Sequence, residues 1–136
     1  MQYAVLSGRI LYSLIFITSG LMGHLMGLES ASMWVGSKGV PLPSVAVIVS
    51  GIVIIVGGIS VLVGYKAKIG AALLLIFLVI VAFVMHDFWD VEDQMMSQMQ
   101  MAMFMKNISM AGAAIIIMYF GSGPLSLEKK DTKEKG

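Results

Sequence analysis

The chain has 136 residues, of which 58% are hydrophobic and only 12% are charged. A soluble domain of this size is nearer a quarter charged and has too small an interior to bury so much apolar surface, which excludes a soluble globular fold. The net charge of +1 argues against a nucleic-acid partner, and the lack of cysteine excludes disulfides, thiolate catalysis and cysteine-ligated iron–sulfur clusters within this chain. The composition therefore predicts an integral membrane protein that contacts the lipid bilayer.

Four hydrophobic segments follow one another along the chain, over about residues 4–26, 43–64, 69–89 and 101–121. Each approaches the ~20 residues that a helix needs to cross the ~30 Å apolar core of a bilayer. Pro43 suits a helix start, and Gly121 with Pro124 ends the last segment. We therefore predict an all-α polytopic membrane protein built as a four-transmembrane-helix bundle.

Charges outside these segments predict the orientation. Lys66 and Lys68 occupy the second loop, and further lysines crowd the C-terminal end, whereas the third loop carries acidic residues and no basic one. Because basic residues collect on the cytoplasmic side, both termini should be cytoplasmic. We expect a transmembrane domain over residues 1–125 and a charged, disordered cytoplasmic tail over residues 126–136.

Several polar residues should meet near the outer membrane face. In this topology His24 ends the first segment, His86 lies near the end of the third, and Lys106 and Asn107 lie near the start of the fourth. Polar groups at membrane depth are costly unless they are paired, so they tend to mark sites. On a continuous helix His86 would share a face with Asp90, which could fix the imidazole tautomer.

Each of these residues also has a structural interpretation. His24 fits a solitary interfacial histidine, and Lys106 fits a side chain that snorkels or pairs with the acidic loop. Phe88 and Trp89 suit an interfacial aromatic belt. Arg9 lies toward the opposite face, where it suits a topology anchor. In either interpretation the amide of Asn107 should hydrogen-bond to another helix.

The 13 methionines raise the question of a metal, because thioethers select Cu(I). Six of them crowd residues 95–105, yet others are spread along the chain. The four-residue spacing of Met95, Met99 and Met103 is typical of a helical stripe, so we predict packing rather than a metal site. Whether segment 95–105 binds copper stays open, and a heme held by His24 and His86 is a weaker alternative.

Three groups of short motifs follow one another over about residues 4–121. They are Gly8–Arg9–Ile10–Leu11 with Phe16 and Ser19–Gly20; Gly57–Gly58 and Gly64 with Lys68–Ile69–Gly70–Ala71; and His86–Asp87–Phe88–Trp89 with Gln94 or Gln98 and then Lys106–Asn107. In their order and spacing these motifs resemble the DoxX family. The stretch Ile52–Val56 departs from the pattern, because many members carry an acidic residue there. His24 also departs, because a basic residue is common at its position.

The resemblance implies a four-helix bundle of the cytoplasmic (inner) membrane that is associated with quinone-linked redox chemistry. We expect a membrane subunit that supports quinone- or thiol-linked electron transfer at a polar site near the outer face. His86 would hydrogen-bond a quinone carbonyl or relay its proton, with Asp87 or Asp90 orienting it. Lys106 and Asn107 would stabilise negatively charged oxygen. The candidate cofactor-binding residues are Trp89 and Phe88, which would flank the ring, together with His24 and Arg9. Of these, Arg9 is expected more as an anchor or as a partner across the bundle.

Other functional classes remain open at this stage, including whether the chain is an enzyme. No electron-storing cofactor is evident from the sequence, so a redox cycle needs a partner subunit, and a homo-oligomer is an alternative assembly. The competing hypothesis is a non-enzymatic scaffold or accessory subunit, in which the same polar cluster locks helices together. A small transporter is disfavoured because no charged residue lies near the bilayer midplane. A packed, satisfied cluster would favour the scaffold, and a lipid-accessible pocket would favour a ligand.

Overall fold

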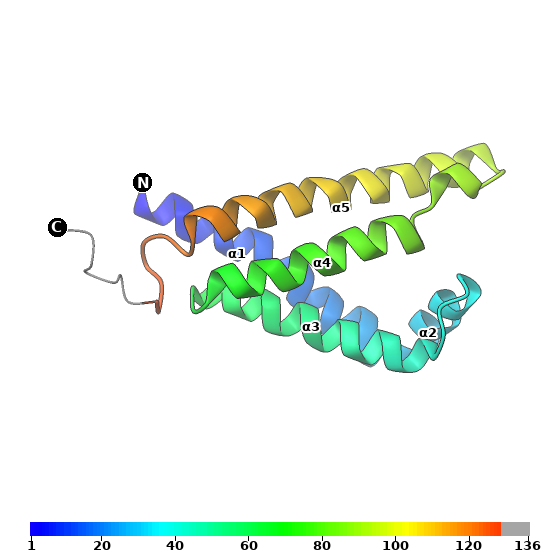
Figure 1. Cartoon of the computed structure of the whole chain (residues 1–136), viewed down its shortest axis with the longest axis horizontal. Coiled ribbons are helices and arrows are strands. Elements are labelled where there is room, and N and C mark those ends of the chain that lie inside the picture. The colour runs from blue at the N-terminus through cyan, green and yellow to red at the C-terminus, as the bar shows by residue number, and fades with distance from the viewer. Residues whose placement is uncertain (129–136) are drawn as a thin grey trace.

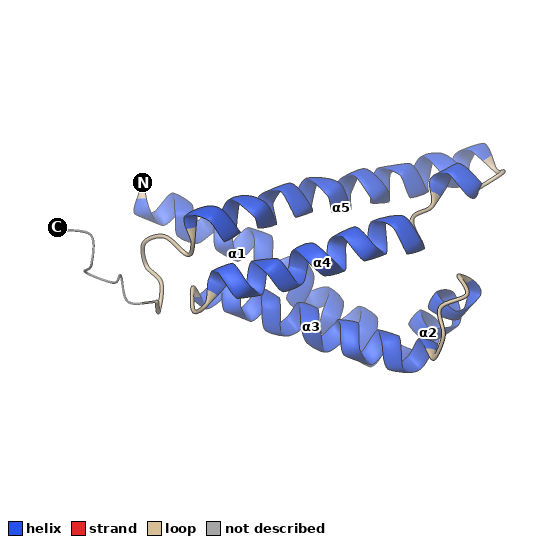
Figure 2. Ribbon diagram, in the orientation of Figure 1, coloured by secondary structure: helices blue, strands red, loops and turns tan. Residues whose placement is uncertain are grey.

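The computed structural model describes residues 1–128, and every regular element among them is a helix (Figure 2). Four stretches are long and apolar enough to cross a membrane, which confirms the all-α, four-span prediction: Gln2–Met26, Pro43–Val63, Ala67–Asp90 and Gln94–Phe120. The N-terminus and the C-terminal segment lie at the same end of the molecule (Figure 1). We call this the terminal end, and we call the opposite end the α2 end after the short helix that lies there.

The first span consists of an α-helix, α1 (Gln2–Thr18), continued by a π-helix, η1 (Ser19–Met26). The π-helix has wider turns than an α-helix, and such segments are frequent at functional sites. It carries His24, whose ring nitrogen Nδ1 bonds the carbonyl oxygen of Ser19 at 2.9 Å. The predicted span 4–26 is therefore present, with an irregularity that hydropathy does not reveal.

A short helix that hydropathy does not predict follows at once. Helix α2 (Leu28–Ser37) packs on η1 and on α3 (Pro43–Val63) at the α2 end (Figure 1). Gly27 precedes it, and Gly39 follows it with a φ of +78°. At ten residues α2 is too short to cross a bilayer, so it adds a cover to that end without adding a span.

Helices α3 and α4 (Ala67–Met85) form an antiparallel pair that is tight near the terminal end. A Cβ added to Gly57 would lie 2.9 Å from Leu74, and one added to Gly70 would lie 3.0 Å from the Gly57 carbonyl oxygen. These glycines let the backbones touch, as small residues do in membrane bundles. Toward the α2 end the two helices diverge (Figure 1). The buried core lies beside the tight region and includes Phe16, Ile54, Val61, Ala71, Leu74, Leu78, Ala111 and Ala114.

The third and fourth spans differ from their predicted bounds. Helix α4 ends at Met85 instead of Trp89, and a short 3-10 turn, η2 (Phe88–Asp90), follows. Helix α5 begins at Gln94 instead of about Met101, because the Asp93 side chain caps it by accepting from the Met96 N–H at 2.9 Å. With 27 residues α5 is about 40 Å long, more than an apolar core of about 30 Å requires. The first turns of α5 contain polar residues, so hydropathy does not predict that the helix begins there.

The segment after α5 folds back over the turn between α3 and α4. The Leu127 N–H donates to the Val63 carbonyl at 3.0 Å, and the Glu128 N–H donates to the Gly64 carbonyl at 2.9 Å. Residues 127 and 128, which follow the predicted domain boundary at residue 125, therefore pack against the turn between α3 and α4. The rest of the predicted disordered tail, residues 129–136, lies outside the described residues.

Candidate ligand-binding cavity

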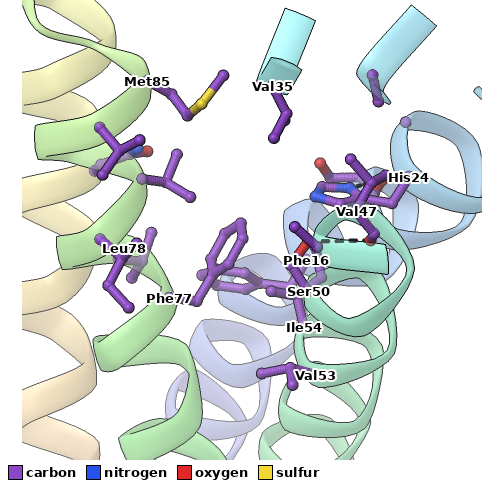
Figure 3. Close-up of a pocket in the computed structure, with 18 of the residues that line it drawn as sticks. Phe16, His24, Val35, Val47, Ser50, Val53, Ile54, Phe77, Leu78 and Met85 are labelled. Atoms are coloured by element: carbon purple, nitrogen blue, oxygen red, sulfur yellow. Dashed lines mark hydrogen bonds between the residues drawn. The ribbon is translucent and has the colours of Figure 1, made fainter. Parts of the chain in front are cut away.

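The divergence of α3 and α4 leaves a cavity of about 960 Å³ toward the α2 end, walled also by η1, α2 and α5 (Figure 3). Its wall is mainly apolar, with Val47 and Ile54 from α3 and Phe77 and Leu78 from α4 (Figure 3). A large apolar cavity with a few polar groups is the usual form of a small-molecule site. The polar or charged residues on its wall are Ser19, His24, Ser30, Ser50, His86, Lys106 and Asn107.

Close contact between η1 and α3 places His24 on this wall. A Cβ added to Gly51 of α3 would lie 2.7 Å from the His24 Cβ, and one added to Gly20 would lie 3.0 Å from the Gly51 carbonyl oxygen. Glycine at both positions lets η1 lie directly on α3. The His24 ring then lies 6.0 Å from the ring of Phe77, which extends from α4 across the cavity (Figure 3).

The two histidines present the same kind of atom to the cavity. Each bonds a carbonyl-type oxygen through Nδ1, His24 to the Ser19 carbonyl at 2.9 Å and His86 to Gln100 Oε1 at 2.8 Å. Such oxygens only accept hydrogen bonds, so Nδ1 carries the proton in both rings. In the neutral imidazole Nε2 is then a free acceptor, and neither Nε2 has a protein partner within residues 1–128.

Asn107 places an amide on the cavity wall. It is only 4% exposed, yet its amide makes no hydrogen bond to another group among residues 1–128. The predicted bond to another helix is therefore absent. The fully buried side-chain nitrogen and oxygen atoms without a partner among the described residues are Arg9 Nε, Ser13 Oγ and Ser32 Oγ, so the amide of Asn107 is not sealed in the protein and is reachable from the cavity. The neighbouring Lys106 is exposed, and its Nζ donates to the Met103 thioether at 3.4 Å, a weak acceptor.

The other candidates from the third loop lie outside the cavity wall. Asp87 forms an ion pair with Lys38 at the end of α2. Asp90 does not share a helical face with His86, because α4 ends at Met85, before both residues, and Gln100 takes the orienting role expected of the aspartates. Phe88 and Trp89 pack in a cluster with Phe83 and Phe104, with ring centroids 5.2 to 6.1 Å apart.

Arg9 lies at the terminal end, remote from the cavity. It is 4% exposed and donates through Nη1 to the Ser122 carbonyl at 3.0 Å and through Nη2 to the Leu125 carbonyl. Arg9 therefore fixes the folded-back C-terminal segment to α1. This agrees with the expectation of pairing across the bundle and does not place it among cofactor-binding residues.

Two residues of the site, Trp34 and Gln100, were not predicted from the sequence. Trp34 of α2 lines the cavity with its ring centroid 5.8 Å from that of His86. Gln100 orients His86, whereas the family-like pattern pointed to Gln94 or Gln98. The signal for Gln100 is its position seven residues before Asn107, which puts both on one face of a helix, but only if the helix starts before residue 100.

Comparison with known proteins agrees with this architecture. Residues 4–87 match the DoxX family model, which is more than half of the chain. The chain belongs to the DoxX family. It is similar to Inner membrane protein YphA of Escherichia coli (strain K12), with 29% identity over 126 residues that cover 93% of this chain and 89% of the relative. No solved structure matches the chain.

Membership of the DoxX family confirms the predicted class, and with the four spans it confirms a multi-pass protein of the inner membrane. The family match ends at Asp87, so Gln100, Lys106 and Asn107 lie beyond it. Within it, the stretch Ile52–Val56 stays apolar because Ile54, 0% exposed, belongs to the core. In this DoxX protein the polar groups of the cavity wall are supplied by η1, α2, Ser50 of α3 and the α4–α5 region.

The Lys38–Asp87 ion pair joins α2 to the end of α4 across the α2 end of the cavity. Both side chains are about a quarter exposed, so we expect a coupling energy of no more than about 1 kcal/mol. A double-mutant cycle of thermal unfolding with Lys38→Met and Asp87→Asn measures it. Single effects that simply add would show that the pair does not hold α2 in place. The same cycle in high salt is the control, since screening should weaken the coupling.

Proposed function

We propose that this DoxX-family protein is a membrane subunit that binds a quinone ring in the cavity and supports quinone-linked electron transfer. The single observation that supports this most strongly is Asn107, a residue that is only 4% exposed and whose amide is reachable from a large apolar cavity and has no hydrogen-bond partner among residues 1–128. A scaffold would be expected to satisfy such a group within the protein. A mainly apolar wall also favours an apolar ring over a small polar thiol.

The residues present fit a quinone. A quinone has a flat apolar ring and carbonyl oxygens that need donors, and the cavity offers apolar walls with Asn107 Nδ2 and Lys106 Nζ as donors. Its reduced form bears hydroxyl groups that need acceptors, and Nε2 of His24 and of His86 are acceptors without protein partners in the described part of the chain. The wall therefore holds groups that suit both forms.

Each residue has a task that follows from its chemistry. A bound quinone supplies a lipid-soluble carrier of electrons and protons. His24 and His86 accept hydrogen bonds or protons at Nε2, with their rings held by Ser19 and Gln100. Lys106 stabilises negative charge on a ring oxygen, and Asn107 fixes the ring's orientation. Electrons enter or leave through a partner subunit, because this chain has no cysteine for a cluster.

Native mass spectrometry of the protein extracted gently from its own membrane tests the proposal. We expect a retained quinone, and we expect His86→Ala to lose it while the protein stays folded, because that variant removes an acceptor from the cavity wall. The matched control is Asp90→Ala, which changes an exposed residue of the same region outside the cavity. Ligand-free protein that carries a stoichiometric protein partner would instead support an accessory subunit.

A further inference from the structure

We infer that the ligand of this cavity carries a long apolar tail, and that the tail leaves the cavity between α3 and α4 directly into the bilayer. This inference rests on the proposed function and adds to it both the class of ligand and its route. The cavity wall contains Val49 of α3 and Ile76 and Ile80 of α4, yet these side chains are 54%, 59% and 56% exposed. Residues that both line a cavity and remain exposed mark an opening, and these three are the most exposed large apolar residues of the wall, whereas Ile15 of α1 and Met103 of α5 are 38% and 37% exposed.

The position of this mouth follows from the glycines of the helix pair. Near the terminal end, Gly57 and Gly70 let α3 and α4 touch. Toward the α2 end, Val53 and Phe77 line the space between the two helices (Figure 3). Gly51, the glycine of α3 in this region, accommodates η1 and not α4. The α3–α4 pair is therefore closed at one end and open at the other, within helices long enough to lie in the membrane.

The opposite side of the cavity suits the polar head and not the tail. There a single hydrogen bond joins α1 to α5, from the Tyr12 hydroxyl to the Met110 carbonyl at 3.2 Å. That side also carries Lys106, whose ammonium would lie against any apolar chain leaving there. The mouth between α3 and α4 presents only aliphatic side chains, from Val49, Ile76 and Ile80.

The third exit, toward the α2 end, is covered. Helix α2 contributes Ala31, Trp34 and Val35 to the cavity wall, and the Lys38–Asp87 pair joins it to the end of α4. A water-soluble ligand would need that exit, whereas a molecule dissolved in the bilayer reaches the mouth between α3 and α4 sideways. The geometry therefore fits an amphiphile with a compact oxygen-bearing ring at the polar wall and an alkyl or isoprenoid chain in lipid.

Photolabelling of the full-length protein in lipid nanodiscs tests the route. The probe is a benzoquinone whose alkyl chain carries a diazirine a few carbons from the ring, and labelled peptides are mapped by mass spectrometry. We expect labels on α3 and α4 around Val49, Ile76 and Ile80, displaced by excess unlabelled decyl-benzoquinone. Displaceable labels on η1 and α5 would overturn the inferred route and leave the proposed function intact. Labels that no quinone displaces would overturn the proposed function itself.

Narrowing the mouth provides a second test, with binding followed by quenching of Trp34 fluorescence in a Trp89→Phe background. We expect Ile76→Phe with Ile80→Phe to weaken decyl-benzoquinone binding about tenfold and to leave a tail-less benzoquinone unaffected. The matched control is Ile52→Phe with Ile69→Phe, on exposed faces of the same helices outside the cavity. Equal effects on both quinones, or no effect on either, would overturn the inferred tail route. Absence of quenching by either quinone before any mouth substitution would overturn the proposed function.

Discussion

Replacing Asn107 with leucine should make the ligand-free protein more stable and at the same time weaken quinone binding by at least about tenfold. Leucine has nearly the shape of asparagine, and the site is 96% buried, since Asn107 is 4% exposed. The amide has no partner among residues 1–128 and is reachable from the cavity, so its replacement loses no internal hydrogen bond and adds an apolar side chain to a mainly apolar wall. We expect a gain of about 1 kcal/mol in the free energy of unfolding.

The two halves of this result are measured separately, by thermal unfolding in detergent and by quinone quenching of Trp34. Ser109→Ala is the control, because Ser109 is an exposed polar residue of the same helix that does not line the cavity. A structural role for Asn107 would reverse the stability change, with Asn107→Leu unfolding at lower temperature. A stable variant that binds quinone normally would remove the main support for the proposed function.

The second large effect is expected at Gly51. A Cβ at this position would lie 2.7 Å from the His24 Cβ, a distance that is too short for two carbon atoms. The His24 Cβ is attached directly to the backbone, so a change of rotamer cannot move it away. Gly51→Ala should therefore push η1 off α3 and move His24 on the cavity wall. We expect a loss of about 1–3 kcal/mol of stability, as for overpacked cores, together with weaker quinone binding.

Gly112→Ala is the matched control for this change. Gly112 also lies inside a membrane-spanning helix, but a Cβ there would meet nothing within 4 Å. Alanine at Gly112 should raise stability by about 0.5–1 kcal/mol, because it restricts the unfolded chain without a clash. The comparison uses the thermal midpoints of both variants and their Trp34 quenching. Similar midpoints for the two variants would show that Gly51 does not hold η1 against α3.

Much of the site could be located from the sequence, because topology alone fixes depth in a membrane. His24, His86, Lys106 and Asn107 were expected near one face from the order of the spans, and all of them line one cavity. Their partners could not be found in this way. Gln100 and Trp34 approach His86 only because α5 starts early and α2 folds over the end of the bundle, and neither feature leaves a mark in hydropathy.

The sequence by itself determined the fold class, the four spans and the family, because a helix in lipid must satisfy its backbone internally and needs about 20 apolar residues. Tertiary structure alone decided which polar groups share a cavity. In the folded chain α4 ends just before His86, Asp87 pairs with Lys38, and Gln100 hydrogen-bonds the His86 imidazole. Tertiary structure also placed Gly57 against α4 and Gly51 against η1, so that the helices close at one end and separate at the other. Contacts between side chains that are far apart in the sequence set the separations between the helices, and the local sequence pattern carries no information about those contacts.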